Sequence, residues 1–180
     1  FTGKRLLLTD VTKVWAVDEK GAKTVIAEEK DFPMPIRFLN DLALTSDARY
    51  AYVSDMGASD KMFGPDGKLW PLGSAAAKEL PAIGRVYKIR LSDNKVTLAV
   101  GESPDMPTPN GIAVRPDGTL LIADFFTGNL IEVRKGKAVP IRTGFRGREG
   151  TALDRHGDIY WRSGTDGKRW RRWTNPQAAD

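Results

Sequence analysis

The feature that most constrains this chain is a sequence pattern that occurs three times. Each copy begins with a polar residue, runs through a short apolar strand, a turn containing Asp and a second apolar strand, and ends on Asp or Ser. The first and last residues lie 15, 14 and 14 positions apart. The copies run from Asn40 to Asp55, from Asn110 to Asp124 and from Glu149 to Ser163. A repeat of this kind indicates one supersecondary unit used several times.

Further strands are expected after each copy. A third apolar segment follows all three copies, at residues 85–89, 129–133 and 168–173, and a fourth follows the first two, at 95–99 and 137–141. Four short strands per unit, with Asn110 and Glu149 39 residues apart, are typical of a β-propeller blade. We therefore predict an all-β fold of the propeller type.

The start of the chain fits the same register. Strands are expected at residues 5–10, 14–17 and 24–27, and Asp10 matches Asp55 and Asp124, so the first unit enters at its second strand. The last unit stops after its third strand, which gives about three and a half four-stranded blades in a single domain, residues 1–180. Propellers close a ring, so we expect either a longer natural chain, the favoured alternative, or two copies that associate through open blade edges.

One segment departs from the repeat. Residues 59–81 are too long for a hairpin turn and carry an Ala-rich stretch, Ala75–Leu80, that predicts a short helical turn. Long loops inside compact domains are usually functional. We interpret residues 59–81 as an inserted loop. Apolar residues that flank or line it could form a wall of a substrate site or only pin the loop to the blade face; they are Met56, Met62, Phe63, Trp70 and Leu72.

Composition excludes several kinds of chemistry. The 180 residues include no cysteine, so there is no disulfide, thiolate metal site or cysteine nucleophile. The single histidine, His156, cannot build a triad, and no Gly-x-Ser-x-Gly motif is present. No apolar run approaches the roughly 20 residues of a membrane span, so no membrane partner is expected.

The net charge of +5 is unevenly distributed. Residues 134–173 hold twelve Lys or Arg and four acids. Such a segment can bind an anionic partner, and Trp170 and Trp173 between arginines could stack on a nucleic acid strand. An outer propeller strand with solvated arginines explains the same pattern, and we favour it over nucleic acid binding.

The polar first residues of the repeats are the main candidates for chemistry. Repeat geometry would bring Asn40, Asn110 and Glu149 to one mouth of the central channel. Two amide oxygens and a carboxylate suit Ca²⁺, Mg²⁺ or Mn²⁺, and Zn²⁺ less well. Alternatively, these residues only cap the entry of each strand, as Asn does in turns. The residue pattern leaves both interpretations open.

Three motifs resemble the gluconolactonase family, which includes senescence marker protein, also called regucalcin. They are Phe38-Leu-Asn-Asp-Leu-Ala43, Pro109-Asn-Gly-Ile-Ala113 with Pro116-Asp-Gly118, and Leu120-Leu-Ile-Ala-Asp124. The resemblance implies a six-bladed propeller with a divalent metal at the channel mouth. It implies Ca²⁺ first, with Zn²⁺, Mn²⁺ or Mg²⁺ as alternatives.

The resemblance also implies roles for single residues. Asn110 matches a metal-binding Asn, and Glu149 stands where the family has an Asp that binds the metal and acts as general base. Asn40 matches an Asn that faces metal or substrate, which we assign to substrate binding. Arg37 resembles a substrate-contacting Arg, although it lies three residues before the Asn rather than two. A further Glu ligand of the family would fall before Phe1.

The function implied is metal-dependent hydrolysis of a sugar lactone or related ester at the channel mouth, as in a gluconolactonase-like hydrolase. No Ser or Cys nucleophile is needed, because the metal activates water and a carboxylate accepts the proton. The alternative is a non-catalytic propeller that binds a protein or small ligand, since fold does not fix function. Localisation stays open, with a periplasmic or extracellular place favoured over the cytoplasm.

Overall fold

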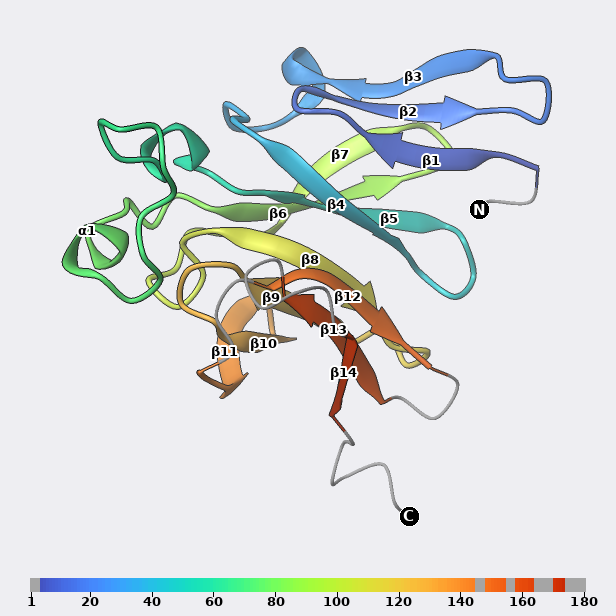
Figure 1. The fold of residues 1–180 in the computed structure, drawn as a ribbon. Helices are drawn as coiled ribbons and strands as arrows, with labels where there is room; N and C mark the ends of the chain where they lie inside the picture. The colour runs from blue at the N-terminus through green and yellow to red at the C-terminus, as the bar shows by residue number, and fades with distance from the viewer. Residues whose placement is uncertain (1–3, 145–147, 155–157, 164–169, 174–180) are drawn as a thin grey trace.

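The strands of this protein form four antiparallel sheets that follow one another along the chain (Figure 1). The computed structural model describes residues 4–144, 148–154, 158–163 and 170–173. The first sheet, blade 1, contains β1 (Leu6–Thr9), β2 (Lys13–Val17) and β3 (Lys23–Glu28). Blade 2 contains β4 (Leu39–Leu44), β5 (Tyr50–Asp55), β6 (Arg85–Arg90) and β7 (Lys95–Val100).

The second half of the chain repeats this arrangement. Blade 3 contains β8 (Pro109–Val114), β9 (Leu120–Asp124), β10 (Leu130–Arg134) and β11 (Lys137–Arg142). Blade 4 contains β12 (Arg148–Leu153), β13 (Ile159–Ser163) and β14 (Trp170–Trp173). In each sheet the strands pair in chain order, which is the up-and-down meander of a propeller blade.

The blades are arranged side by side through their first strands. β4 lies against β8, and β8 lies against β12, so the inner strands of blades 2, 3 and 4 are neighbours (Figure 1). The predicted all-β fold, a partial propeller of about three and a half blades, is therefore confirmed.

Apolar side chains between consecutive blades form the core. Buried residues of blade 1 pack on blade 2, those of blade 2 on blade 3, and those of blade 3 on blade 4. Each interface has a cluster with buried residues from both blades: Val14 and Val53 belong to the first, Val86 and Ile122 to the second, and Leu121 and Ile159 to the third. Each blade thus needs its neighbour to keep water from its apolar face.

From their places in the repeat, side chains of the inner strands are expected to be packed and those of the outer strands to be solvated, and most residues follow this pattern. Arg134, Lys135 and Lys137 on the outer strands of blade 3 are exposed, and Ile112 and Ala113 of β8 are buried. Ala152 of β12 is exposed, although its place in the repeat predicts burial.

A long connection, residues 56–84, joins β5 to β6. It contains two short helices, η2 (Ser59–Lys61) and α1 (Ala75–Lys78), and a tight hairpin whose bridge joins Phe63 to Leu69. Ser74 caps α1, because its hydroxyl accepts a hydrogen bond from the backbone N–H of Ala77 at 3.3 Å. Within the described ranges, no helix has the length and apolar character that crossing a membrane requires.

Candidate functional site

The candidate site begins where the three inner strands begin. Asn40, Asn110 and Glu149 are each the second residue of their strand, β4, β8 and β12. At each of these places the pairing with the next strand shifts by one residue, which is a β-bulge. A bulge re-aims the side chain it carries. The three predicted site residues therefore share one backbone irregularity at one end of neighbouring strands.

Hydroxyl groups tie the bulge of one blade to the preceding blade. Thr9 Oγ1 at the end of β1 donates a hydrogen bond to the carbonyl oxygen of Asn40 at 2.6 Å. Ser54 Oγ near the end of β5 donates in the same way to the carbonyl oxygen of Asn110 at 2.7 Å. Thr9 and Ser54 each directly precede the repeated Asp. The same position of the repeat therefore supplies the hydroxyl that fixes each Asn backbone.

The repeated aspartates hold the entry to each inner strand. Asp55 Oδ1 accepts a hydrogen bond from the backbone N–H of Phe38 at 2.9 Å. Asp124 Oδ2 accepts one from the backbone N–H of Thr108 at 2.6 Å. Phe38 and Thr108 each lie two residues before the Asn of their blade. Both carboxylates are fully buried, so these charge-assisted bonds fix the path of the chain into the bulge.

A third carboxylate links the two bulges directly. Asp41 Oδ2 on β4 accepts a hydrogen bond from the backbone N–H of Ile112 on β8 at 2.9 Å. Its own backbone N–H donates to Ser54 Oγ at 3.0 Å. Burial raises the pKa of the Asp41 carboxyl, and the hydrogen bonds from the Ile112 and Leu42 backbones oppose that shift.

Met56 brings the two Asn side chains together. Asn40 Nδ2 donates to Met56 Sδ at 3.1 Å, and Asn110 Nδ2 lies 3.7 Å from the same sulfur. Met56 is itself held, because its backbone N–H donates to the Phe38 carbonyl at 2.9 Å. Among the described residues, neither Asn amide oxygen has a hydrogen-bond donor, although Asn110 is only 7% exposed. The sulfur therefore takes one N–H of each amide, and the two oxygens remain as acceptors.

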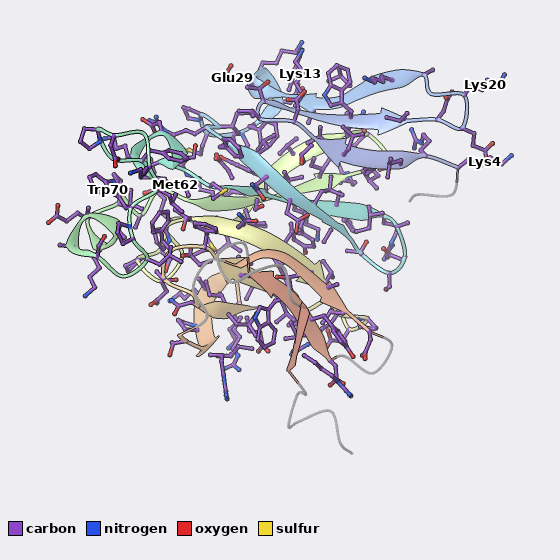
Figure 2. All side chains as sticks on the ribbon, in the orientation of Figure 1. Lys4, Lys13, Lys20, Glu29, Met62 and Trp70 are labelled. Atoms are coloured by element: carbon purple, nitrogen blue, oxygen red, sulfur yellow. The ribbon has the colours of Figure 1, made fainter. Side chains whose placement is uncertain are left out.

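These two amides open onto a cavity of about 560 Å³. Phe125 follows Asp124 as Met56 follows Asp55, and both line the cavity. The β5–β6 connection supplies another wall. Its Met62 is buried in an apolar cluster with Met56 and Phe125, and Trp70 packs against this cluster (Figure 2). The lining residues are Phe38, Asn40, Met56, Ser59, Asp60, Met62, Phe63, Leu69, Asn110 and Phe125.

The structure brings only some of the predicted site residues together. Asn40 and Asn110 line one cavity. Arg37 is exposed and does not line this cavity. Its backbone N–H donates a hydrogen bond to Asp55. Glu149 lies on β12, which is adjacent to the Asn110 strand, but its side chain is outside the described residues, as is all of His156. Within the described part of the chain, no three His, Cys, Asp or Glu side chains are grouped as a metal site.

The sequence marks Met56 as a candidate for an apolar wall beside the inserted loop, but it predicts neither the hydrogen bonds from the two amides to its sulfur nor the bulges. A thioether that accepts from two amides has no sequence signature, and a bulge is a property of strand pairing. The interblade hydroxyls did leave a signal, because Thr9-Asp10 and Ser54-Asp55 occupy the same repeat position.

Comparison with known proteins gives a structural likeness only. No family model and no curated protein sequence matches the chain. Among solved structures, regucalcin from Agrobacterium tumefaciens, described as a calcium-binding protein, is 22% identical with a TM-score of 0.60, over 96% of this chain and 57% of its own. A gluconolactonase from Xanthomonas campestris is 18% identical with a TM-score of 0.62, over 92% and 54%.

A protein of different activity shares the fold as well. Hydrazine synthase from Kuenenia stuttgartiensis is 17% identical with a TM-score of 0.64, over 98% of this chain and 44% of its own. At these identities the matches establish the fold and not the chemistry. The structural neighbours include the gluconolactonase and regucalcin proteins that the sequence motifs resemble, and the chain spans little more than half of their length.

Proposed function

We propose that this chain forms part of a metal-dependent hydrolase that opens a lactone or cleaves a related ester at the propeller mouth. One observation carries the proposal. Two Asn residues on equivalent bulges of neighbouring blades have their amide nitrogens held by one sulfur, while their oxygens stay free at the edge of a cavity. The structural neighbours named gluconolactonase and regucalcin support the same assignment.

The donor chemistry fits a divalent cation. Asn40 and Asn110 offer neutral amide oxygens, and the carboxylate of Glu149 would come from the next inner strand. Oxygen ligands of this kind favour Ca²⁺, with Mn²⁺, Mg²⁺ and Zn²⁺ as alternatives. When bound, such an ion polarises the ester carbonyl and lowers the pKa of a water molecule.

The remaining tasks fall to the chain itself. Asn40 and Asn110 would hold the ion through their amide oxygens, because their backbones are fixed by Thr9, Ser54 and the buried aspartates. Glu149 is the proposed general base, because it is the acidic one of the three equivalent residues Asn40, Asn110 and Glu149. The cavity walls exclude bulk water from the ester, which strengthens each polar contact there.

Metal titration tests the proposal without relying on turnover. We expect calorimetry with CaCl₂ and MnCl₂ to detect binding, and Asn110→Ala and Asn40→Ala each to weaken it at least about tenfold. Asn94→Gly is the matched control, since Asn94 is exposed in a turn at a positive φ of 58° that glycine adopts freely. Equal affinity in all variants would refute the metal assignment.

A second arm tests catalysis. A pH-stat assay of lactone hydrolysis at saturating metal should show turnover that Glu149→Gln abolishes, because the amide cannot accept a proton. Metal binding without hydrolysis of any lactone or ester would instead indicate the non-catalytic binding module.

A further inference from the structure

The cavity beside Asn40 and Asn110 has two chemically different parts. One part is the pair of free amide oxygens. The other is a wall of six apolar side chains that come from four separate places: the approach to β4, the end of β5, the 62–69 hairpin and the residue after β9. These apolar residues are Phe38, Met56, Met62, Phe63, Leu69 and Phe125.

The exposure of Phe63 indicates that a ligand covers this apolar wall. The Phe63 side chain is 53% exposed, the highest value among the large apolar residues exposed in the described ranges. Of those exposed residues it is the one that lines the cavity. The hairpin bridge to Leu69 and the hydrogen bond from the Trp70 N–H to the Met62 carbonyl, 3.0 Å long, hold it there. A fixed aromatic residue at the rim of an apolar cavity is typical of a small-molecule site.

The polar groups of the lining are too few for a polyhydroxylated substrate. Among the described residues, the lining includes besides the two Asn only Ser59 and Asp60 as polar side chains, and it includes no Lys or Arg. Each Asn nitrogen already gives one of its two N–H groups to Met56. Each sugar hydroxyl placed against the apolar wall would lose its hydrogen bonds to water without replacement, which disfavours binding.

We propose that the substrate carries an alkyl or aryl substituent on its lactone or ester group, with that group at the end of the cavity where the Asn pair lies and the substituent against Met62, Phe63 and Phe125. The inference rests on the proposed function and narrows its substrate class from sugar lactones to lactones or esters with an apolar substituent.

Binding of a pair of lactams tests the inference without hydrolysis. A δ-lactam with a pentyl side chain and gluconolactam share a ring amide that ring-opening enzymes hydrolyse poorly. The first carries an apolar chain where the second carries hydroxyl groups. Methyl-¹³C-methionine NMR reports where each binds. The chain has four methionines; Met56 and Met62 line the cavity, while exposed Met34 and buried Met106 lie outside it and serve as internal controls.

We expect the pentyl lactam to shift the Met56 and Met62 signals and to bind at least about tenfold more tightly than gluconolactam, since each buried CH₂ favours binding. Phe63→Ser should weaken the pentyl lactam about fivefold, whereas Leu98→Ser, which removes a similarly exposed apolar side chain from β7, should not. Tighter binding of gluconolactam, or no shift at Met56 and Met62, would overturn the inference.

Rates with δ-decalactone and δ-gluconolactone separate this inference from the proposed function. Faster hydrolysis of δ-decalactone supports both. Faster hydrolysis of δ-gluconolactone refutes the apolar substrate and leaves the hydrolase standing. If neither is hydrolysed while the pentyl lactam still shifts the two signals and binds more tightly, the hydrolase proposal fails and the preference for an apolar ligand is upheld.

Discussion

Replacing the two repeated aspartates by asparagine should have very different effects on stability. Asp55 and Asp124 occupy the same repeat position, and both side chains are fully buried. The two carboxylates differ in how their hydrogen bonds are shared between Oδ1 and Oδ2. In Asp124, Oδ2 alone accepts from the backbone N–H of Thr108 at 2.6 Å, and Oδ1 accepts from Thr108 Oγ1 and from both the backbone N–H and hydroxyl of Thr127.

The geometry sets the magnitudes. An Asn at 124 can keep the Oδ1 bonds, but its Nδ2 then faces the Thr108 N–H, so two buried donors oppose each other. Losing a charge-assisted bond and leaving the donors unsatisfied should lower the free energy of unfolding by about 2–4 kcal/mol. In Asp55, Oδ1 accepts from Phe38 and Gly57 and also lies 3.3 Å from the Arg37 nitrogen, so the Arg37 N–H keeps an acceptor. Asp55→Asn should therefore lower it by only about 0.5–1.5 kcal/mol.

Urea denaturation at neutral pH, followed by tryptophan fluorescence, measures both variants. With a typical dependence of about 2 kcal/mol per M urea, Asp124→Asn should lower the midpoint by about 1–2 M and Asp55→Asn by less than about 1 M. Because Thr108 leads into β8, Asp124→Asn should also weaken metal binding. Equal midpoints for the two variants, or a larger effect at Asp55, would refute the assigned hydrogen bonds.

Three further changes test the site. Ser54→Ala removes the hydroxyl that donates to the Asn110 carbonyl at 2.7 Å. Urea denaturation should show that the free energy of unfolding falls by about 1–3 kcal/mol, and calorimetry should show weaker metal binding. An unchanged metal affinity would contradict the role of Ser54 in positioning Asn110. Met56→Leu keeps the volume and removes the acceptor of both amides, so metal affinity should fall several-fold with a stability change under about 1.5 kcal/mol; unchanged affinity would show that the sulfur does not orient Asn40. Burial raises the pKa of Asp41, so its contribution to stability is present below about pH 4 and is lost as pH rises through the raised pKa. The difference in unfolding free energy between wild type and Asp41→Asn should therefore decrease from about pH 4 upward, and a difference that does not change with pH would contradict the raised pKa.

The fold could be predicted because its signal is local and repeated. The short apolar strands and their Asp-containing turns fix each hairpin, and three copies in one register indicate blades. The inner strands β4, β8 and β12 contain the expected first residues. Exposure of Ala152 could not be predicted this way, since burial depends on which surface covers a strand and not on its place in the repeat.

The site could be predicted only in part. Repeat geometry was enough to place Asn40 and Asn110 at one cavity. It could not show that Met56 holds both amides, since a sulfur acceptor is found only from three-dimensional distances. Arg37 shows the same limit, because its backbone N–H donates to Asp55 while its side chain is exposed and does not line the cavity. The apolar wall depends on the 62–69 hairpin folding back, and the described connections of the other blades contain no such hairpin.

Anomalous diffraction from crystals soaked in MnCl₂ tests the central claim most directly. We expect a manganese peak at the mouth of the cavity, about 2.0–2.6 Å from the amide oxygens of Asn40 and Asn110, which is the usual metal–ligand distance. Crystals of Asn110→Ala should show no such peak. A peak elsewhere on the chain, or contact through neither amide oxygen, would contradict the claim.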